Sequence, residues 1–104
     1  MSVGYVVAPA ALDDIDEIVE WMQRNDPDSN IDLRFIDAVY DAFEFLAGQP
    51  RVGHRRHDLT SHDVLFWTVM KSFAVIYRGG PPVEIVHVTR WSRDLPNLLA
   101  DDGR

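Results

Sequence analysis

Cysteine is absent from this 104-residue sequence, lysine occurs once, and no long apolar run is present. Without cysteine the chain can form no disulfide, catalytic thiolate or cysteine-ligated zinc site, which is compatible with a reducing compartment. A membrane-spanning helix needs about 20 consecutive apolar residues. The N-terminus also lacks the basic and apolar regions of a signal peptide. The sequence therefore predicts a cytoplasmic protein.

The composition is that of an ordinary globular protein. Hydrophobic residues make up 46% of the chain and charged residues 26%, which excludes the low-hydrophobicity composition of disordered proteins. A chain of this length can bury one hydrophobic core but not two. We therefore expect a single domain that spans residues 1–104.

The net charge of −7 disfavours direct binding to nucleic acid, because phosphate contacts require clustered Lys and Arg. The charge is unevenly distributed along the chain. Residues 1–50 hold eleven Asp and Glu against two Arg, whereas residues 51–93 hold seven basic residues against three acidic ones. An acidic partner would thus bind the C-terminal half, although two solvated faces would produce the same asymmetry.

Two amphipathic helices are predicted in the N-terminal half. The β-rich run Tyr5–Pro9 suits a first strand, and from residue 9 to residue 24 apolar side chains recur every three or four positions. Turn formers at residues 25–30 end this helix. A second apolar stripe covers about residues 29–47 and is stopped by the Gly-Gln-Pro sequence at residues 48–50. The short connection predicts an antiparallel helical hairpin.

Three β-rich runs follow without a helical stretch between them: Val64–Val69, Phe73–Arg78 and Val83–Arg90. Their short links predict an antiparallel meander. Arg93–Leu99 is interpreted as a short helical turn. The predicted fold class is therefore α+β, with an N-terminal strand, a helical hairpin packed on one face of the sheet, and a short C-terminal helical tail.

The segment GHRRHDLTSHD at residues 53–63 raises the question of a metal site. Its candidate ligands are His54, His57, Asp58, His62 and Asp63. The segment lacks the helical periodicity that would place His54 and His57 on one face, and the HExxH pattern is absent. We therefore expect a solvated loop with no metal or cofactor. The strand that follows would bury Phe66 or Trp67 against the helices.

A basic and aromatic set remains as the candidate site. Its members are Arg55, Arg56, Arg78, Arg90, Trp91 and Arg93. Arginines can clamp carboxylates of a partner bidentately. In a metal-independent ribonuclease they could instead stabilise the phosphate transition state, with Tyr77 or His87 moving the proton. A third interpretation is structural, in which Trp67 and Tyr77 are half-buried sheet residues and Arg78 merely ends its strand. No nucleophile elbow or P-loop is present.

The order of elements and several motifs resemble toxins of the ParE/RelE superfamily of type II toxin–antitoxin systems. APAALDDIDEIVEWM is similar to the first helix of the ParE branch, and RFIDAVYDAFEFLAGQPRVG to its second helix and following turn. FAVIYR is similar to the central strand, and RDLPNLL to the terminal Arg-Asp signature. GHRRHDLTSHDVLFWTV resembles a segment of the subgroup called plasmid stabilisation proteins. The resemblance covers essentially the whole chain.

This resemblance implies a non-enzymatic toxin that inhibits DNA gyrase and is neutralised by an antitoxin, usually of the ribbon-helix-helix type. The RelE branch instead cleaves ribosome-bound mRNA with a dense basic set. A net charge of −7 and a single lysine make that activity the alternative. A further alternative is a non-toxic relic that acts only as an antitoxin-binding partner.

The segment VHVTRWSRD departs from the family pattern. The family commonly carries a basic residue at His87, a histidine at Arg90 and a small residue at Trp91. We expect Arg55, Arg56, Arg90 and Arg93 to contact the target or antitoxin, with Trp91 among them as an apolar anchor. Growth arrest would then depend on Arg90 and Trp91.

Overall fold

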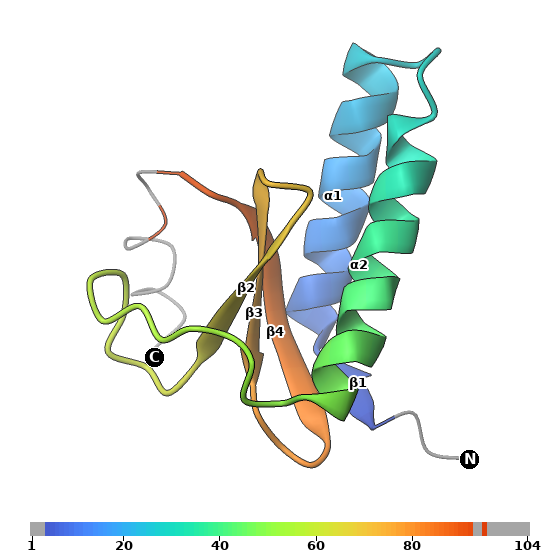
Figure 1. Ribbon diagram of the computed structural model, residues 1–104. Helices are drawn as coiled ribbons and strands as arrows, with labels where there is room; N and C mark the ends of the chain where they lie inside the picture. Colours follow the sequence, from blue (N-terminus) through green and yellow to red (C-terminus); the bar gives the residue numbers. More distant parts are fainter. Residues whose placement is uncertain (1–3, 93–94, 96–104) are drawn as a thin grey trace.

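A computed structural model describes residues 4–92 and residue 95, and its two helices lie side by side against one face of a sheet (Figure 1). The elements are β1 (Tyr5–Val7), α1 (Pro9–Asn25), α2 (Ile31–Gly48), β2 (Leu65–Val69), β3 (Phe73–Arg78) and β4 (Val83–Arg90). The predicted bounds agree with these within two residues. The predicted helical turn over residues 93–99 lies outside the described residues, apart from the buried Leu95. No helix in the described part of the chain is long and apolar enough to cross a membrane.

The four strands form one sheet in the order β1-β4-β3-β2. β2 pairs antiparallel with β3, and β3 pairs antiparallel with β4, which confirms the predicted meander. β1 pairs parallel with β4, with Tyr5 opposite Val83 and Val7 opposite Ile85, so the sheet is mixed. The parallel pairing requires a crossover, and the helical hairpin is part of that connection.

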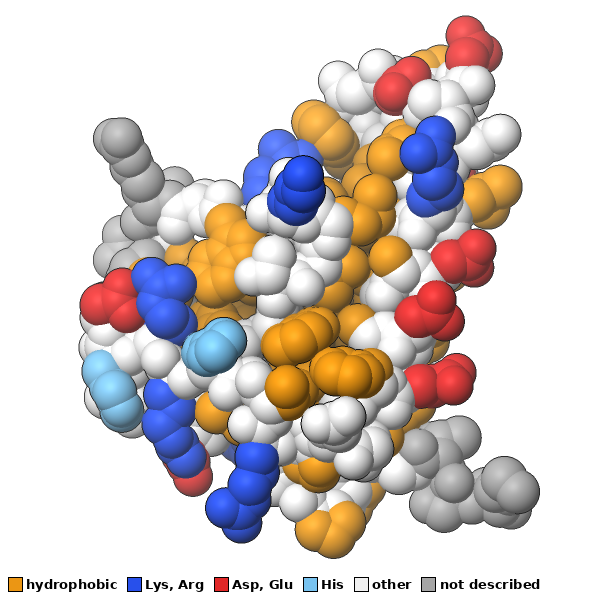
Figure 2. Space-filling model, in the orientation of Figure 1, with side chains coloured by type: hydrophobic (Ala, Val, Ile, Leu, Met, Phe, Trp, Pro, Cys, Tyr) orange, Lys and Arg blue, Asp and Glu red, His pale blue; other side chains and the backbone are white. Residues whose placement is uncertain are grey.

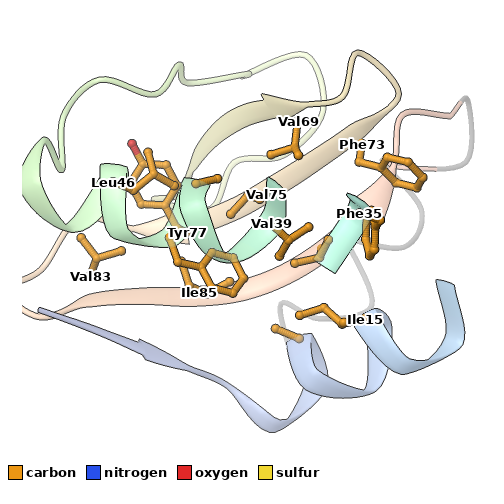
Figure 3. Close-up of a cluster of buried hydrophobic side chains, with 14 of the residues drawn as sticks. Ile15, Phe35, Val39, Leu46, Val69, Phe73, Val75, Tyr77, Val83 and Ile85 are labelled. Carbon is orange, nitrogen blue, oxygen red and sulfur yellow. The ribbon is translucent and has the colours of Figure 1, made fainter. Parts of the chain in front are cut away.

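The main core lies between the helical hairpin and the facing side of the sheet (Figure 3). Ile15 of α1 and the α2 residues Phe35 and Val39 point toward β3 and β4. These side chains recur at the spacing of one helical face, so a single stripe per helix is buried. The α+β arrangement predicted for this face of the sheet is confirmed.

The opposite side of the sheet, here called the outer face, carries a second apolar cluster. Its buried members are Val64, Phe66, Ala74, Ile76 and Leu95, with Leu59 and Trp91 packed against them. The loop before β2 runs on this side of the sheet in Figure 1. Because both faces are covered, β3 is buried along Phe73–Tyr77, and its sequence reads as a continuous apolar run without alternation.

The choice between Phe66 and Trp67 is settled by the pleat of β2. Trp67 faces the helices, where its ring centroid lies 5.2 Å from that of Phe45 on α2. Phe66 points to the outer face and stacks with Trp91 at 5.8 Å between centroids. Successive residues of a strand alternate between faces, so only one of the two could contact the helices.

Helix α1 supports the edge of β4 where β1 has ended. The carboxylate oxygen Oδ2 of Asp14 accepts a hydrogen bond from the Val88 backbone N–H at 3.1 Å. The same oxygen lies 2.7 Å from Nδ1 of the buried His87. Asp14 thus accepts the backbone hydrogen bond that a neighbouring strand would otherwise accept. This contact holds α1 against the edge of the sheet.

Candidate interaction sites

Five of the six residues predicted to contact a partner lie among the described residues. They lie at three places on the surface, and Trp91 borders two of them. Arg93 lies outside the described residues. In Figure 2 most acidic side chains in view follow the helical hairpin, whereas basic and histidine side chains gather over the loop and strands at the left. This distribution agrees with the charge asymmetry of the sequence.

The first place is a groove of about 640 Å³ between the tip of the helical hairpin and the turn that joins β2 to β3. We call it the apolar groove. Its lining residues are Trp21, Met22, Asn25, Asp26, Ile31, Met70, Ser72, Phe73, Arg90 and Trp91. The groove combines large apolar side chains with one arginine, Arg90, and one carboxylate, Asp26, so it offers an apolar contact area with one charge of each sign.

Arg90 is held over an aromatic ring at this groove. Its guanidinium carbon lies 4.2 Å from the centroid of the Trp21 ring and 5.9 Å from that of Phe73. Trp21 is 42% exposed. Sequence reasoning did not select Trp21, although a tryptophan outside the apolar stripe of an amphipathic helix was a usable signal. The arrangement pre-positions an exposed aromatic ring and a cation together.

The second place is on the outer face, where Arg56 lies over Trp91 at 5.3 Å from the ring centroid. Arg56 also donates two hydrogen bonds to the Asp58 carboxylate, at 2.9 and 2.8 Å. The hydrogen bond from Arg56 lowers the pKa of Asp58. Trp91 Nε1 donates to the Thr68 hydroxyl at 3.3 Å. Trp91 is half-buried and packs against the apolar cluster of the outer face.

The third place is a polar hollow of about 610 Å³ at the ends of β2 and β3 remote from their connecting turn. We call it the basic pocket. It is lined by Pro50, Arg51, Gly53, His54, Arg55, Asp63, Leu65, Arg78 and Gly79. Arg55 forms an ion pair with Asp63, and Arg78 forms one with Glu84 at 3.0 Å. Arg51 was not selected from the sequence. It shares the pocket with Arg78, which comes 27 positions later in the chain, so no local pattern connects the two.

One histidine of the loop, His54, lies beside β2. His54 pairs through its backbone with Phe66 of β2, with hydrogen bonds of 2.9 and 2.8 Å. His54 is also one of the residues that line the basic pocket. Within residues 4–92 and residue 95, no three His, Asp or Glu side chains are arranged to hold a metal ion.

Tyr77 and His87, the two candidates for proton transfer, are buried. The Tyr77 hydroxyl accepts a hydrogen bond from the Gly53 backbone N–H at 2.9 Å, and burial raises the pKa of this phenol. His87 lies against Asp14. Both side chains therefore contribute to the interior, in agreement with the structural interpretation of Tyr77.

The fold and these surfaces define a small α+β protein with a helical hairpin on a mixed four-stranded sheet and an exposed apolar and arginine-bearing surface. Residues 5–95 match the model of the family described as "ParE toxin of type II toxin-antitoxin system, parDE". The chain therefore belongs to the ParE toxin family, a toxin family of type II toxin–antitoxin systems.

The fold is similar to a solved structure described as "Chromosomal ParDE TA system from P. aeruginosa". The TM-score is 0.69 with 17% sequence identity, and the similarity covers 85% of this chain and 95% of that chain. A comparison with curated proteins finds no match.

Proposed function

We propose that this protein is the toxin of a type II toxin–antitoxin pair and acts in the cytoplasm by inhibiting DNA gyrase through protein–protein contact. Membership of the ParE family supports the toxin role, and the resemblance to the ParE branch favours gyrase as the target. The observation that carries the contact mechanism is the stacking of Arg90 on the exposed Trp21 beside the apolar groove. Trp and Arg are the residues that most often dominate binding energy at protein interfaces.

A nuclease mechanism has less support from the described residues. A general acid or base must come within hydrogen-bonding reach of its substrate. Tyr77 and His87 are instead buried and engaged with Gly53 and Asp14. The outer face of the sheet is apolar and covered. These features favour inhibition by binding.

The decisive experiment compares two targets with the same purified protein. We expect inhibition of gyrase-catalysed DNA supercoiling, and no cleavage of mRNA on translating ribosomes. A matched pair of variants links the result to the groove: Trp21→Ala should lose the inhibition, whereas Arg24→Ala on the same helix should retain it. Site-specific mRNA cleavage that requires ribosomes would overturn the proposal in favour of a RelE-like endonuclease.

The proposed partner is an antitoxin whose tail covers exposed apolar side chains. Among the described residues, the large hydrophobic side chains left exposed are Val6, Leu12, Trp21, Leu33, Phe45 and Met70. Apolar surface of this kind often marks an interface. An extended tail could also pair with a sheet edge. On β2 the outward backbone groups of Phe66 are already paired with His54, so the accessible part of this edge is expected around Thr68.

The antitoxin proposal is tested on the neighbouring reading frame. A short frame that begins with a ribbon-helix-helix sequence should encode a protein that co-purifies with this chain and restores growth. Absence of binding by such a product would contradict the proposal. Harmless induction of this chain, together with an intact complex, would instead support the relic interpretation.

A further inference from the structure

The basic pocket carries an excess of positive charge. Arg51, Arg55 and Arg78 line it, and Asp63 is its one acidic lining residue. Glu84 pairs with Arg78 from outside the lining, so the three arginines face two carboxylates and together these five side chains carry a net charge of +1. The same region includes the loop after α2 and the ends of β2 and β3, so elements distant in sequence bring these charges together.

Most of the guanidinium donors in the pocket remain available. A guanidinium offers five N–H groups, and both Arg55 and Arg78 use Nη1 for their ion pairs with Asp63 and Glu84. Arg51 has no ion-pair partner among the described residues. The two ion pairs also orient their arginines, which lowers the entropy lost when a ligand binds.

We propose that the basic pocket binds the phosphate group of inorganic phosphate or of a phosphate monoester. Such a group carries a charge of about −1.5 to −2 at neutral pH and presents three acceptor oxygens. This charge is opposite in sign to the positive excess of the pocket. A single carboxylate has half the charge and two oxygens, so it would satisfy fewer of the donors. Guanidinium groups also match phosphate geometry bidentately.

The proposed phosphate site is independent of the gyrase and antitoxin proposals. Leu65 and Arg78, which line the basic pocket, lie near one end of the β2–β3 hairpin, where Leu65 pairs with Tyr77, the residue before Arg78. Met70 and Phe73, which line the apolar groove, lie at its opposite end. Loss of one site should therefore leave the other intact.

The test is titration of the full chain with inorganic phosphate at constant ionic strength, followed by amide chemical shifts. We expect saturable binding at one site, with shifts centred on residues 51–55 and 78–79. Acetate should bind at least about tenfold more weakly. A nucleoside 5′-monophosphate and a short 5′-phosphorylated oligonucleotide are titrated in the same way. Equal affinity for these two ligands and for inorganic phosphate would show that the pocket recognises the phosphate group alone. Tighter binding of one ligand would show that the pocket also contacts the group attached to its phosphate.

Four variants test which side chains bind the phosphate. Arg51→Gln and Arg78→Gln should each weaken phosphate binding by about tenfold, the value of one charged hydrogen bond. Asp63→Asn should strengthen binding because it removes the negative charge in the pocket. The matched control Arg34→Gln changes an exposed arginine of α2 and should have no effect. The proposal fails if phosphate does not saturate, if acetate binds equally well, or if Arg34→Gln weakens binding as much as Arg51→Gln.

Discussion

The Arg90 guanidinium at the end of β4 lies 4.2 Å from the centroid of the Trp21 ring on α1. This contact connects two of the elements that line the apolar groove. Both residues are exposed, and an exposed cation–π pair contributes only about 0.5–1 kcal/mol to stability. The pair is therefore a minor part of the fold, and its main effect is to fix the shape and charge of a surface.

Replacement of Trp21 or Arg90 by alanine should abolish growth arrest while the chain remains folded. At a binding hot spot such a truncation costs about 2 kcal/mol or more of binding free energy. Induced toxicity of each variant measures the effect, and circular dichroism confirms folding. Arg24→Ala, on the same helix but outside the groove, is the control. Folded Trp21→Ala and Arg90→Ala proteins with full toxicity would show that the groove is not the contact surface.

Asp14→Ala should lower the free energy of unfolding by about 1–3 kcal/mol, because it removes the acceptor of the part-buried Val88 N–H. Asp14→Asn keeps an acceptor oxygen and should cost less. The Asp16→Ala variant changes an exposed carboxylate of the same helix and serves as the control. Urea unfolding measures stability, and hydrogen exchange of the Val88 amide reports on the bond. Unchanged exchange in Asp14→Ala would contradict this role.

The secondary structure could be predicted because local patterns determine it. Apolar spacing defined both helices, and short turn-rich links defined the meander. The position of β1 beside β4 could not be predicted in this way, since three residues carry no pattern that selects a neighbour. The contact that Asp14 makes with β4 could not be predicted either. Its partner Val88 is 74 positions away in the sequence.

The candidate sites were harder to predict. Residues adjacent in the sequence, such as Arg55 and Arg56, were assigned to one surface, but the fold places them at different ones. Arg55 and Arg56 occur side by side in the sequence, yet Arg55 lines the basic pocket and Arg56 covers Trp91. Adjacency in the sequence therefore did not place the two side chains in one site. Arg51 and Arg78 show the converse, because only the tertiary fold brings them to the same pocket.

Lys71→Gly should stabilise the protein by about 0.5–1 kcal/mol, because L-residues pay a cost in the left-handed conformation that glycine avoids. Lys71 adopts φ 65° in the turn between β2 and β3, next to Met70 at φ 53°. Lys71→Val should destabilise, since a β-branched side chain tolerates this conformation least. Thermal unfolding of the two variants provides the measurement. Equal melting temperatures for both would show that the turn carries no such cost.

The protein should lose stability at alkaline pH through the ionisation of Tyr77. Burial raises the pKa of the Tyr77 phenol, so the folded state holds its proton at a pH where the unfolded chain, with a tyrosine pKa of about 10, has lost it. The unfolded state thus binds fewer protons in this range. The contribution of Tyr77 to stability is therefore complete below about pH 10 and is lost as the pH rises toward the folded pKa.

Tyr77→Phe should separate this effect from the hydrogen bond to Gly53. At neutral pH the variant should lose about 0.5–1.5 kcal/mol, because the Gly53 N–H loses its acceptor. Above pH 10 its stability should fall less steeply than that of the parent chain. Burial also raises the pKa of Tyr5, so part of the slope should remain in Tyr77→Phe and disappear in the double variant Tyr5→Phe/Tyr77→Phe. Urea unfolding between pH 7 and about pH 11, just above the tyrosine pKa, provides the comparison. Equal slopes for the parent chain and Tyr77→Phe would rule out Tyr77 as a source of the alkaline transition.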